Sequence, residues 1–398
     1  MQNDKPILFV EINETNYIFA AGVYDEDRNL KVVEKIIITN KEISKNKFKN
    51  FEDASNIIKQ NVEQIENKLN YIFKDLTLII ENFDHTCINI SGSKKLNGSQ
   101  VLKENISYIL NSLKSSIAEN EKQKSILHIF NTKSILDGNS TDNLPIGLFG
   151  DFYNHELTFF LIANNDLRNI KQIFSKNNLE VKKILLKSFN EGTQLIKQKK
   201  VETFFKIKIG RKNSSISFFD QSAFQYSENL NFGTDIILKD ISKICSLENE
   251  VILNILQDNI LHSEDINKNE FLKEKYFTNR SYRKIRKKLI KDIARARIEE
   301  IANIIFNQNI NIKILKQTDY KIYLTILDKI VLNNFGKSFE LFFSNEKGLV
   351  PELIDSFEVN SAISNAADLS IHGWKKEAIP IIQRKNSLIT RIFKSIFG

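Results

Sequence analysis

The clearest chemical pattern in this sequence lies at its C-terminal end, in the run IQRKNSLITRIFKSIFG at 382–398. At about 100° per residue, a helix through this run separates its large apolar side chains from its polar ones. The apolar half holds Leu388, Ile389, Ile392, Phe393, Ile396 and Phe397, and the polar half holds Arg391 and Lys394 with no acid. This pattern suits the boundary layer of an anionic membrane, and the run is too short to span one. A terminal helix docked on the protein core is the alternative.

Few other residues are arranged for catalysis or for metal binding. Cys87 and Cys245 have no CxxC neighbour, so we expect neither a disulfide framework nor a thiol motif. The five histidines include no H-x-x-x-H pair, which argues against a zinc site. The sequence therefore nominates no catalytic residue and no metal ligand.

A second concentration of charge is the basic run NRSYRKIRKKLIKDIARAR at 279–297, in a chain of formal net charge +8. Its apolar positions keep helical spacing through Ile285, Leu289, Ile290, Ile293, Ile298 and Ile301. One face is therefore expected to be core, and the other is either a solvated basic face or a binding surface. No helix-turn-helix, zinc spacing or aromatic ladder accompanies it, so no nucleic-acid partner is expected.

Length and composition limit the class of protein. The 398 residues predict more than one lobe. Hydrophobic residues at 41% and charged residues at 27% are typical of a soluble globular protein. The first ten residues have no signal-peptide layout, so we expect a bacterial-type cytoplasm as the compartment.

Hydrophobic spacing then predicts the elements that must hold these residues. Residues 7–39 read as a three-stranded meander, 51–73 as a helix and 76–81 as a strand, which together are typical of the start of an actin-like nucleotide fold. Residues 84–162 read as a small inserted α/β region with strands at 86–90, 125–130 and 156–162 and a helix at 101–118. Further on we expect a helix at 167–177, a strand at 181–186, a hairpin of 204–209 with 215–220, a helix opening at 231–235, a basic helix at 280–307, a strand region at 320–332 and a helix at 362–371.

Several motifs in this order resemble those of the cell-division protein family FtsA. The run Ile126–Gly150 carries Asp137-Gly138, Asn143, Pro145-Ile146-Gly147 and Gly150 where that family has "DG" and "NPIGM.G", with Glu156 starting the strand that follows. Ile90–Lys94 resembles the segment opening the family's insertion. Residues 178–181, 231–235 and 293–301 resemble "GLEVD", "PVGGDH" and "IIEPRxEEI". The match is collinear over nearly the whole chain.

This resemblance implies a fold class and a domain layout. The fold is α/β, an actin-like (ribonuclease H-like) two-lobed fold with an FtsA-type inserted α/β subdomain and a C-terminal amphipathic helix. The expected parts are 1–83 and 163–198 for the first lobe, 84–162 for the insertion, 199–240 and 310–357 for the second-lobe core, 241–309 for its outer subdomain, 358–381 for a closing first-lobe helix, and 382–398 for linker and membrane helix.

The resemblance also implies a nucleotide site built on two hairpin turns. Glu11-Ile12-Asn13-Glu14-Thr15 replaces the family's Asp-Ile-Gly-Thr, and Lys208–Ser215 replaces Asp-Ile-Gly-Gly-Gly-Thr-Thr-Asp. The family's adenosine-side Thr-Gly-Gly is replaced near Leu324–Asp328. The candidate nucleotide-binding residues are Asn13, Glu14, Thr15, Gly210, Arg211, Lys212, Asn213 and Gly233.

Some of these replacements favour nucleotide binding and others oppose it. Asn13 and Asn213 tolerate a left-handed backbone and could keep the turn shapes, and Arg211 and Lys212 could bind phosphates by charge. The acids that would organise Mg²⁺ are replaced by Lys208 and Ser215, and Glu14 would point a negative charge at the phosphates. ATP is therefore a candidate ligand whose ordinary Mg-dependent binding is expected to be weakened or lost, with hydrolysis weak or absent. Mg²⁺ itself is left open.

The partners that the resemblance implies are those of a division scaffold. The basic helix would belong to the subdomain that receives the C-terminal peptide of FtsZ, with Arg297 and Glu300 at the family's Arg and Glu positions. Other expected partners are an anionic membrane surface, further copies of the chain in a polymer, and later division proteins on the insertion. The protein would be peripheral on the cytoplasmic face of the inner membrane at the division site. The alternatives are an actin-fold ATPase or kinase-like enzyme and a basic nucleic-acid-associated protein.

Overall fold

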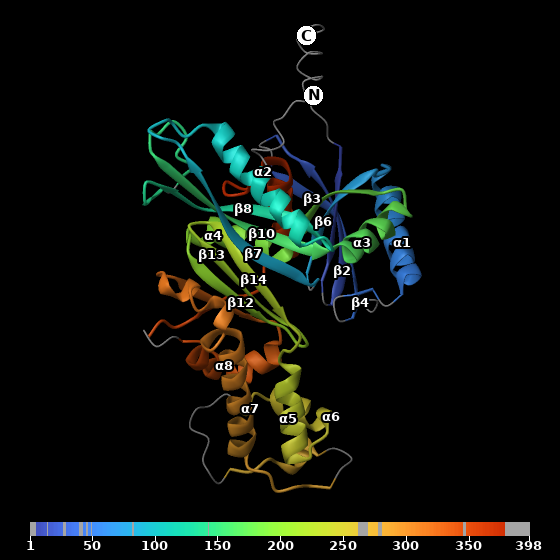
Figure 1. Ribbon diagram of the computed structural model, residues 1–398. Helices are drawn as coiled ribbons and strands as arrows, with labels where there is room; N and C mark the ends of the chain where they lie inside the picture. Colours follow the sequence, from blue (N-terminus) through green and yellow to red (C-terminus); the bar gives the residue numbers. More distant parts are fainter. Residues whose placement is uncertain are drawn as a thin grey trace. The chain divides into compact units, whose positions relative to one another are not determined.

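The structure is a computed structural model that describes residues 5–13, 15–26, 29–39, 43–44, 47–48, 50–81, 83–141, 143–261, 270–277, 281–344 and 348–378 (Figure 1). The chain divides into two compact units. Unit 1 comprises residues 1–202, 219–226 and 357–398, and unit 2 comprises 203–218 and 227–356. Glu14 and the C-terminal amphipathic run lie outside the described residues. Among those described, no helix is long and apolar enough to cross a membrane.

Unit 1 is built on a five-stranded sheet in the order β11-β6-β1-β2-β3. The strands are β1 (Ile7–Ile12), β2 (Asn16–Tyr24), β3 (Leu30–Thr39), β6 (Asp75–Ile80) and β11 (Glu180–Leu186). β1 pairs antiparallel with β2 and parallel with β6, and β11 pairs parallel with β6. The carboxyl ends of β1, β6 and β11 therefore meet at one edge of the sheet. β4 (Ile43–Ser44) and β5 (Lys47–Phe48) form a separate short ribbon.

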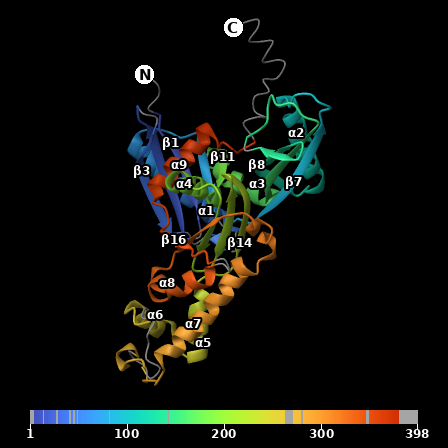
Figure 2. The same cartoon turned by 90° about the vertical axis from the view of Figure 1, so that its left-hand side faces the viewer.

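Helices cover both faces of this sheet. They are α1 (Phe51–Leu69), α3 (Asn164–Ser175), α4 (Lys187–Lys199) and α9 (Val359–His372). α1 and α3 lie together on one face, and α4 and α9 lie together on the other (Figures 1 and 2). Buried amides join the second pair, because the side chain of Asn190 donates to the carbonyl of Ala362 and that of Asn365 donates to Asn190.

A second five-stranded sheet has the order β14-β13-β12-β15-β16. Its strands are β12 (Phe204–Ile209), β13 (Ser214–Asp220), β14 (Ala223–Leu230), β15 (Lys321–Ile326) and β16 (Glu352–Leu353). As in unit 1, the first strand is central, the next two follow it on one side, and two later strands join in parallel on the other side. This repeated order is the topology that the sequence predicted for the fold.

Unit 2 holds four of the described α-helices. They are α5 (Asp235–Cys245), α6 (Asn249–Gln257), α7 (Lys287–Ala302) with a π-helical turn at Asn303–Asn307, and α8 (Lys329–Phe343). Short 3-10 turns lie at Glu274–Tyr276, Ile310–Ile312 and Leu315–Gln317. The helical spacing found in the basic run is explained in part, since Ile290, Ile298 and Ile301 are buried. Leu289, which the spacing also placed on the core face, is 44% exposed, so that prediction was wrong.

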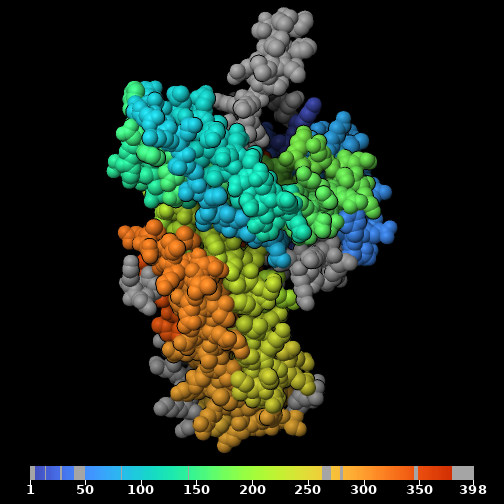
Figure 3. Space-filling view, in the orientation of Figure 1, coloured from blue at the N-terminus to red at the C-terminus, as the bar shows by residue number. Residues whose placement is uncertain are grey.

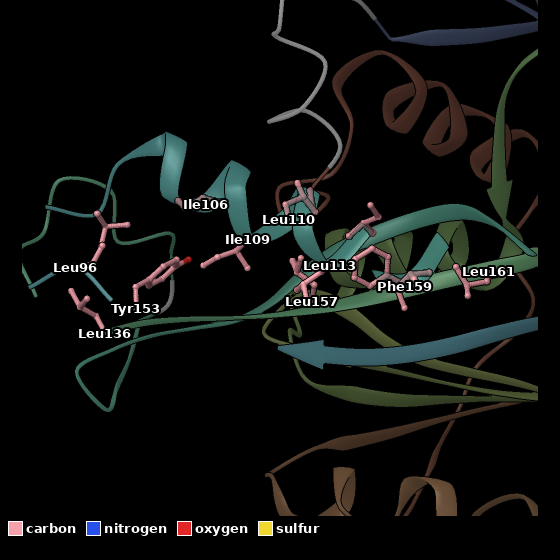
Figure 4. Close-up of a cluster of buried hydrophobic side chains, with 14 residues drawn as sticks. Leu96, Ile106, Ile109, Leu110, Leu113, Leu136, Tyr153, Leu157, Phe159 and Leu161 are labelled. Atoms are coloured by element: carbon pink, nitrogen blue, oxygen red, sulfur yellow. The ribbon is translucent and has the colours of Figure 1, made fainter. Parts of the chain in front are cut away.

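The inserted subdomain lies in the chain between β6 and α3. Its elements are β7 (His85–Lys95), α2 (Lys103–Asn120), β8 (Lys124–Leu136), β9 (Asn139–Thr141) and β10 (Phe152–Ala163), with the sheet order β7-β10-β8-β9. Apolar side chains of α2 meet those of β10 in a buried core (Figure 4). Gly92 permits the close approach of α2, because a Cβ there would lie 2.7 Å from Ile109.

Several expected boundaries were wrong, each for a physical reason. β7 continues to Lys95 because it pairs with β10 along its whole length, although its outer positions are polar. α7 begins at Lys287, not near residue 280. The strand expected over 320–332 ends at Ile326, since the Asp328 side chain accepts the N–H groups of Ile330 and Val331 at 3.1 and 3.2 Å and starts α8.

Candidate phosphate-binding turns

In unit 1 the turn between β1 and β2 is organised by a side chain. The Asn13 carboxamide oxygen accepts the backbone N–H groups of Thr15 at 3.0 Å and Asn16 at 2.8 Å, and its nitrogen donates to Glu11 at 2.8 Å. Asn13 does not adopt a positive φ, so the left-handed turn considered from the sequence is absent at this residue. The N–H groups of Thr15 and Asn16 are thus already hydrogen-bonded within the turn.

A buried charge cluster lies beside this turn, at the carboxyl edge of the parallel strands. The Lys187 ammonium, at the start of α4, is 2.7 Å from Glu11, 3.4 Å from Glu81 and 3.9 Å from Glu191. Glu11 is the next-to-last residue of β1 and Glu81 directly follows β6. This edge of an open α/β sheet is where ligands usually bind.

Electrostatics fixes the charge of Lys187. Burial disfavours the ammonium, but the carboxylates of Glu11, Glu81 and Glu191 outweigh it and hold the pKa of Lys187 well above its usual value. The chain itself therefore supplies a cation to these carboxylates. None of these roles was predicted, and Lys187 follows Glu11 by so many residues that no local signal could have paired them.

In unit 2 the turn between β12 and β13 packs tightly against the loop before α5. The N–H groups of Thr234 and Asp235 donate to the carbonyls of Gly210 and Arg211, both at 2.9 Å. Gly233 is required here, because a Cβ would lie 2.2 Å from the Gly210 oxygen. The predicted residues Gly210, Arg211 and Gly233 are thus brought together, while Asn213, whose carbonyl accepts the Gly210 N–H, has no positive φ.

The cation predicted to bind phosphate in this turn is held by acids of its own unit. The Arg211 guanidinium lies 3.1 Å from Asp235 and 3.9 Å from Asp328. Asp328 is the N-cap of α8 and also accepts a hydrogen bond from Thr234 at 3.5 Å. A phosphate would have to compete with these carboxylates for Arg211. Lys212 is exposed and also has interactions within the protein.

These contacts limit the chemistry of both turns. Glu11 and Asp235, the acids that fold analogy would offer as general bases, are both in ion pairs. Among the described residues, no group of His, Cys, Asp and Glu has a metal-binding arrangement. Asp328 could have been found from its N-cap position in the sequence, but its contact with Arg211 could not.

The two residues predicted for peptide binding lie on α7. Arg297 forms ion pairs with Asp240 on α5 and with Glu300 one turn further along α7. Its side chain is 29% exposed, so it is neither buried in the core nor freely presented. Asp240, which was not predicted, holds the Arg297 guanidinium in an ion pair within unit 2.

A pocket of about 610 Å³ lies in unit 1 at the opposite, amino edge of its sheet. Its wall includes a buried pair in which a His128 ring nitrogen lies 3.3 Å from the Glu377 carboxylate. Burial favours the neutral acid, but His128 and Lys183 outweigh it and hold the pKa of Glu377 below its usual value. This pair fastens the segment after α9 to β8.

Comparisons with known proteins give the class. No family model matches the sequence. The PilM–PilN type IV pilus biogenesis complex contains a chain that matches with TM-score 0.55 and 9% identity, over 93% of this chain and 99% of that chain. MreB5 of Spiroplasma citri bound to AMPPNP matches with TM-score 0.47 and 9% identity, over 92% of this chain and 96% of that chain. The repeated sheet order, together with the likeness to the pilus-complex chain, gives this chain an actin-like fold.

A curated relative narrows this class. The chain is 22% identical over 242 residues to the cell division protein FtsA of Buchnera aphidicola subsp. Schizaphis graminum. The match covers 61% of this chain and 57% of the relative, so it spans little more than half of that protein's length. The chain is therefore similar to FtsA over this part of its length, in agreement with the resemblance that the motifs indicated.

Proposed function

We propose that this protein is a cell-division scaffold that anchors the FtsZ ring to the inner face of the cytoplasmic membrane. Similarity to FtsA is the observation that carries the proposal. The amphipathic run at 382–398 supplies a membrane contact, and α7 with α5 supplies a surface for the FtsZ peptide. Polymerisation of the chain and docking of later division proteins on the insertion belong to the same proposal. The rival reading, an actin-fold ATPase or kinase, is disfavoured by the ion-paired acids of both turns.

The membrane contact is tested by charging the apolar half of the tail. Phe393→Glu or Ile392→Asp should abolish sedimentation with anionic liposomes, because each removes apolar burial worth about 1.5–3 kcal/mol and places a charge in the acyl boundary. Ser395→Asn, on the polar half, is the matched control and should bind as wild type. Full binding by Phe393→Glu with an unchanged melting temperature would show that the tail is not the anchor.

The proposed peptide contact is tested by changing Arg297 and its ion-pair partner Asp240. Arg297→Glu should weaken binding of a peptide copying the FtsZ C-terminus roughly tenfold, in line with a lost charge-assisted hydrogen bond. Asp240→Asn should leave binding equal or stronger, because it releases the guanidinium. Both changes should lower stability by less than about 1 kcal/mol, since the pair is partly exposed. Equal weakening by both variants would instead assign the pair a purely structural role.

Nucleotide binding is expected to be weak and independent of Mg²⁺. In the first turn Lys187 already neutralises Glu11, and in the second Arg211 is engaged by Asp235 and Asp328. Among the described residues, neither turn taken by itself offers a metal-binding arrangement of acids. Calorimetry should give a dissociation constant for ATP that is roughly millimolar or weaker, equal in Mg²⁺ and in EDTA, with negligible hydrolysis. Tight binding that requires Mg²⁺ would contradict this account of both turns.

A further inference from the structure

The end of the inserted subdomain displays large apolar side chains that its core does not use. We call residues 96–102 and 144–152 the insertion tip, which belongs to the cyan-to-green part of the molecule in Figure 3. The exposed apolar residues of the tip are Leu102, Ile146, Leu148, Phe149 and Phe152. Phe149 is 68% exposed and Leu148 is 53% exposed. Contiguous apolar exposure of this kind marks an interaction site more often than a free surface.

This display is fixed by the backbone and is not the result of a frayed loop. The Val101 N–H donates to the Leu148 carbonyl at 2.8 Å, the Gly147 N–H donates to the Val101 carbonyl at 2.9 Å, and the Gly98 N–H donates to the Gly150 carbonyl at 3.1 Å. The two segments therefore form one hydrogen-bonded surface. Gly147 has φ +89°, a conformation that places Ile146 and Leu148 on either side of a tight turn.

The motif that first suggested the family shapes this tip. Asp137 has a left-handed backbone with φ 49°, and its carboxylate accepts the N–H groups of Asp151 at 2.9 Å and Phe152 at 2.7 Å. Gly150 leaves room for it, because a Cβ there would lie 2.7 Å from the Asp137 carboxylate. The Asp-Gly and Pro-Ile-Gly residues thus hold Leu148 and Phe149 outward.

The core under the tip is already complete. Leu96, Leu136 and Tyr153 pack together at this end of the subdomain (Figure 4), and Val101 is fully buried. Since these residues fill the interior, the outward apolar side chains contribute nothing to it. A function outside the subdomain is needed to explain them.

The described chain ends on the same subdomain. After α9, the Asn131 N–H donates to the Lys376 carbonyl at 2.7 Å and the Ala378 N–H donates to the Ile129 carbonyl at 2.8 Å, so this segment lies along β8. Ala378 is fully buried in the core between α2 and the sheet. The last described residue of the chain therefore lies in the inserted subdomain itself.

The chain is long enough between these parts for the insertion tip and the C-terminal tail to contact the same membrane surface. Along β8, Leu136 at the tip is roughly 23 Å from Ile129, at about 3.3 Å per residue. Residues 379–387, which precede the apolar tail, can span up to about 30 Å. A tail lying in a membrane and the insertion tip can therefore reach the same lipid surface.

We infer that the insertion tip is a second membrane contact, which inserts Leu148 and Phe149 into the lipid layer that holds the C-terminal tail. This inference rests on the proposed membrane attachment. The rim of the tip carries charges of both signs, with Lys95 and Lys103 near Glu104 and Asp151. The tip therefore binds through apolar insertion, and its contribution differs from that of the purely basic tail by being insensitive to salt.

The test is sedimentation of the full chain with vesicles of phosphatidylglycerol and phosphatidylethanolamine. The double variant Leu148→Ser with Phe149→Ser should bind roughly ten- to a hundredfold more weakly, because it loses two apolar insertions that act together with the tail. The loss should be the same at low and high salt. Ile310→Ser in unit 2, where the isoleucine is 81% exposed, is the matched control and should bind as wild type.

A fluorescence measurement keeps the test independent of any folding defect. In Phe149→Trp with Trp374→Phe, the indole at 149 should shift to shorter wavelength with vesicles and be quenched by brominated acyl chains. The absence of both effects would overturn the inference. A second result would also overturn it. If gel filtration shows that the wild type self-associates and the double serine variant does not, while both bind lipid equally, the tip is a contact between copies of the chain.

The proposed tail contact and the proposed tip contact can be contradicted independently of each other. If Phe393→Glu alone leaves binding intact and the serine variant removes it, the proposed tail anchor is wrong and the tip stands. If Phe393→Glu removes sedimentation and the serine variant sediments as wild type at every salt concentration, the tail stands and the tip contact is wrong.

Discussion

Replacement of Lys187 by methionine is expected to lower the free energy of unfolding by about 3–5 kcal/mol, the usual cost of leaving a buried charge unpaired. The ammonium lies among Glu11, Glu81 and Glu191, and the side chains of Glu11 and Glu191 are only 3% and 8% exposed. Without it, the carboxylates repel one another in a region that water scarcely reaches. Denaturant unfolding at neutral pH measures the loss.

The exposed pair of Lys197 with Asp368 provides a matched control. Its atoms are 2.9 Å apart, but both side chains are more than 40% exposed, so Lys197→Met should cost less than about 1 kcal/mol. The variant Lys187→Met should also regain stability below about pH 5, where carboxylates take up protons. Equal small losses for the two methionine variants would show that the cluster is not a structural centre of unit 1.

Acidification is expected to unfold the inserted subdomain through His155. This residue of β10 is fully buried, neither ring nitrogen has a hydrogen-bond partner among the described residues, and burial lowers its pKa from 6.5 to about 4. Below about pH 6.5 the His155 imidazole binds a proton in the unfolded chain, whereas in the folded protein it binds one only below about pH 4. Stability should therefore fall by about 2 kcal/mol by pH 5 and about 3 kcal/mol by pH 4.

The variant His155→Leu removes both the titration and the unpaired nitrogens. It should be more stable than the wild type by about 1–3 kcal/mol at pH 7.5, and the advantage should grow as the pH falls from 6.5 to 4. His372→Leu, at an exposed histidine at the end of α9, is the matched control and should not raise stability at pH 7.5 by a comparable amount. Parallel pH profiles for the wild type and His155→Leu would mean that His155 is protonated or hydrated in the folded protein.

The sequence predicted the architecture well because hydrophobic spacing follows the local backbone. The hairpin of β12 and β13, the helix opening near Asp235 and the strand–helix order of the insertion were confirmed. β7 was cut short, since Ser91, Ser93 and Lys95 on its outer side look like a turn when the pairing with β10 is unknown. The helices α4, α6 and α8 were not predicted.

The candidate site was less predictable, because its decisive contacts are long-range. Nothing near Glu11 in the sequence indicates that Lys187 neutralises it, and nothing near Arg211 indicates that Asp328 competes for it. The resemblance identified the turns, and Asn13 was expected to act through its backbone. The structure shows that it acts through its side chain, which hydrogen-bonds the turn internally.

The most direct test of the proposed tether is recruitment of FtsZ polymers to lipid. FtsZ, GTP and anionic vesicles are mixed with the full-length protein, with Phe393→Glu or with Arg297→Glu, and FtsZ that floats with the vesicles is measured. We expect FtsZ to float with the wild-type protein, to remain in the lower fraction with Phe393→Glu, and to float in clearly smaller amount with Arg297→Glu, although Arg297→Glu itself still floats. The proposed tether would be contradicted if FtsZ remains in the lower fraction although the wild-type protein floats with the vesicles.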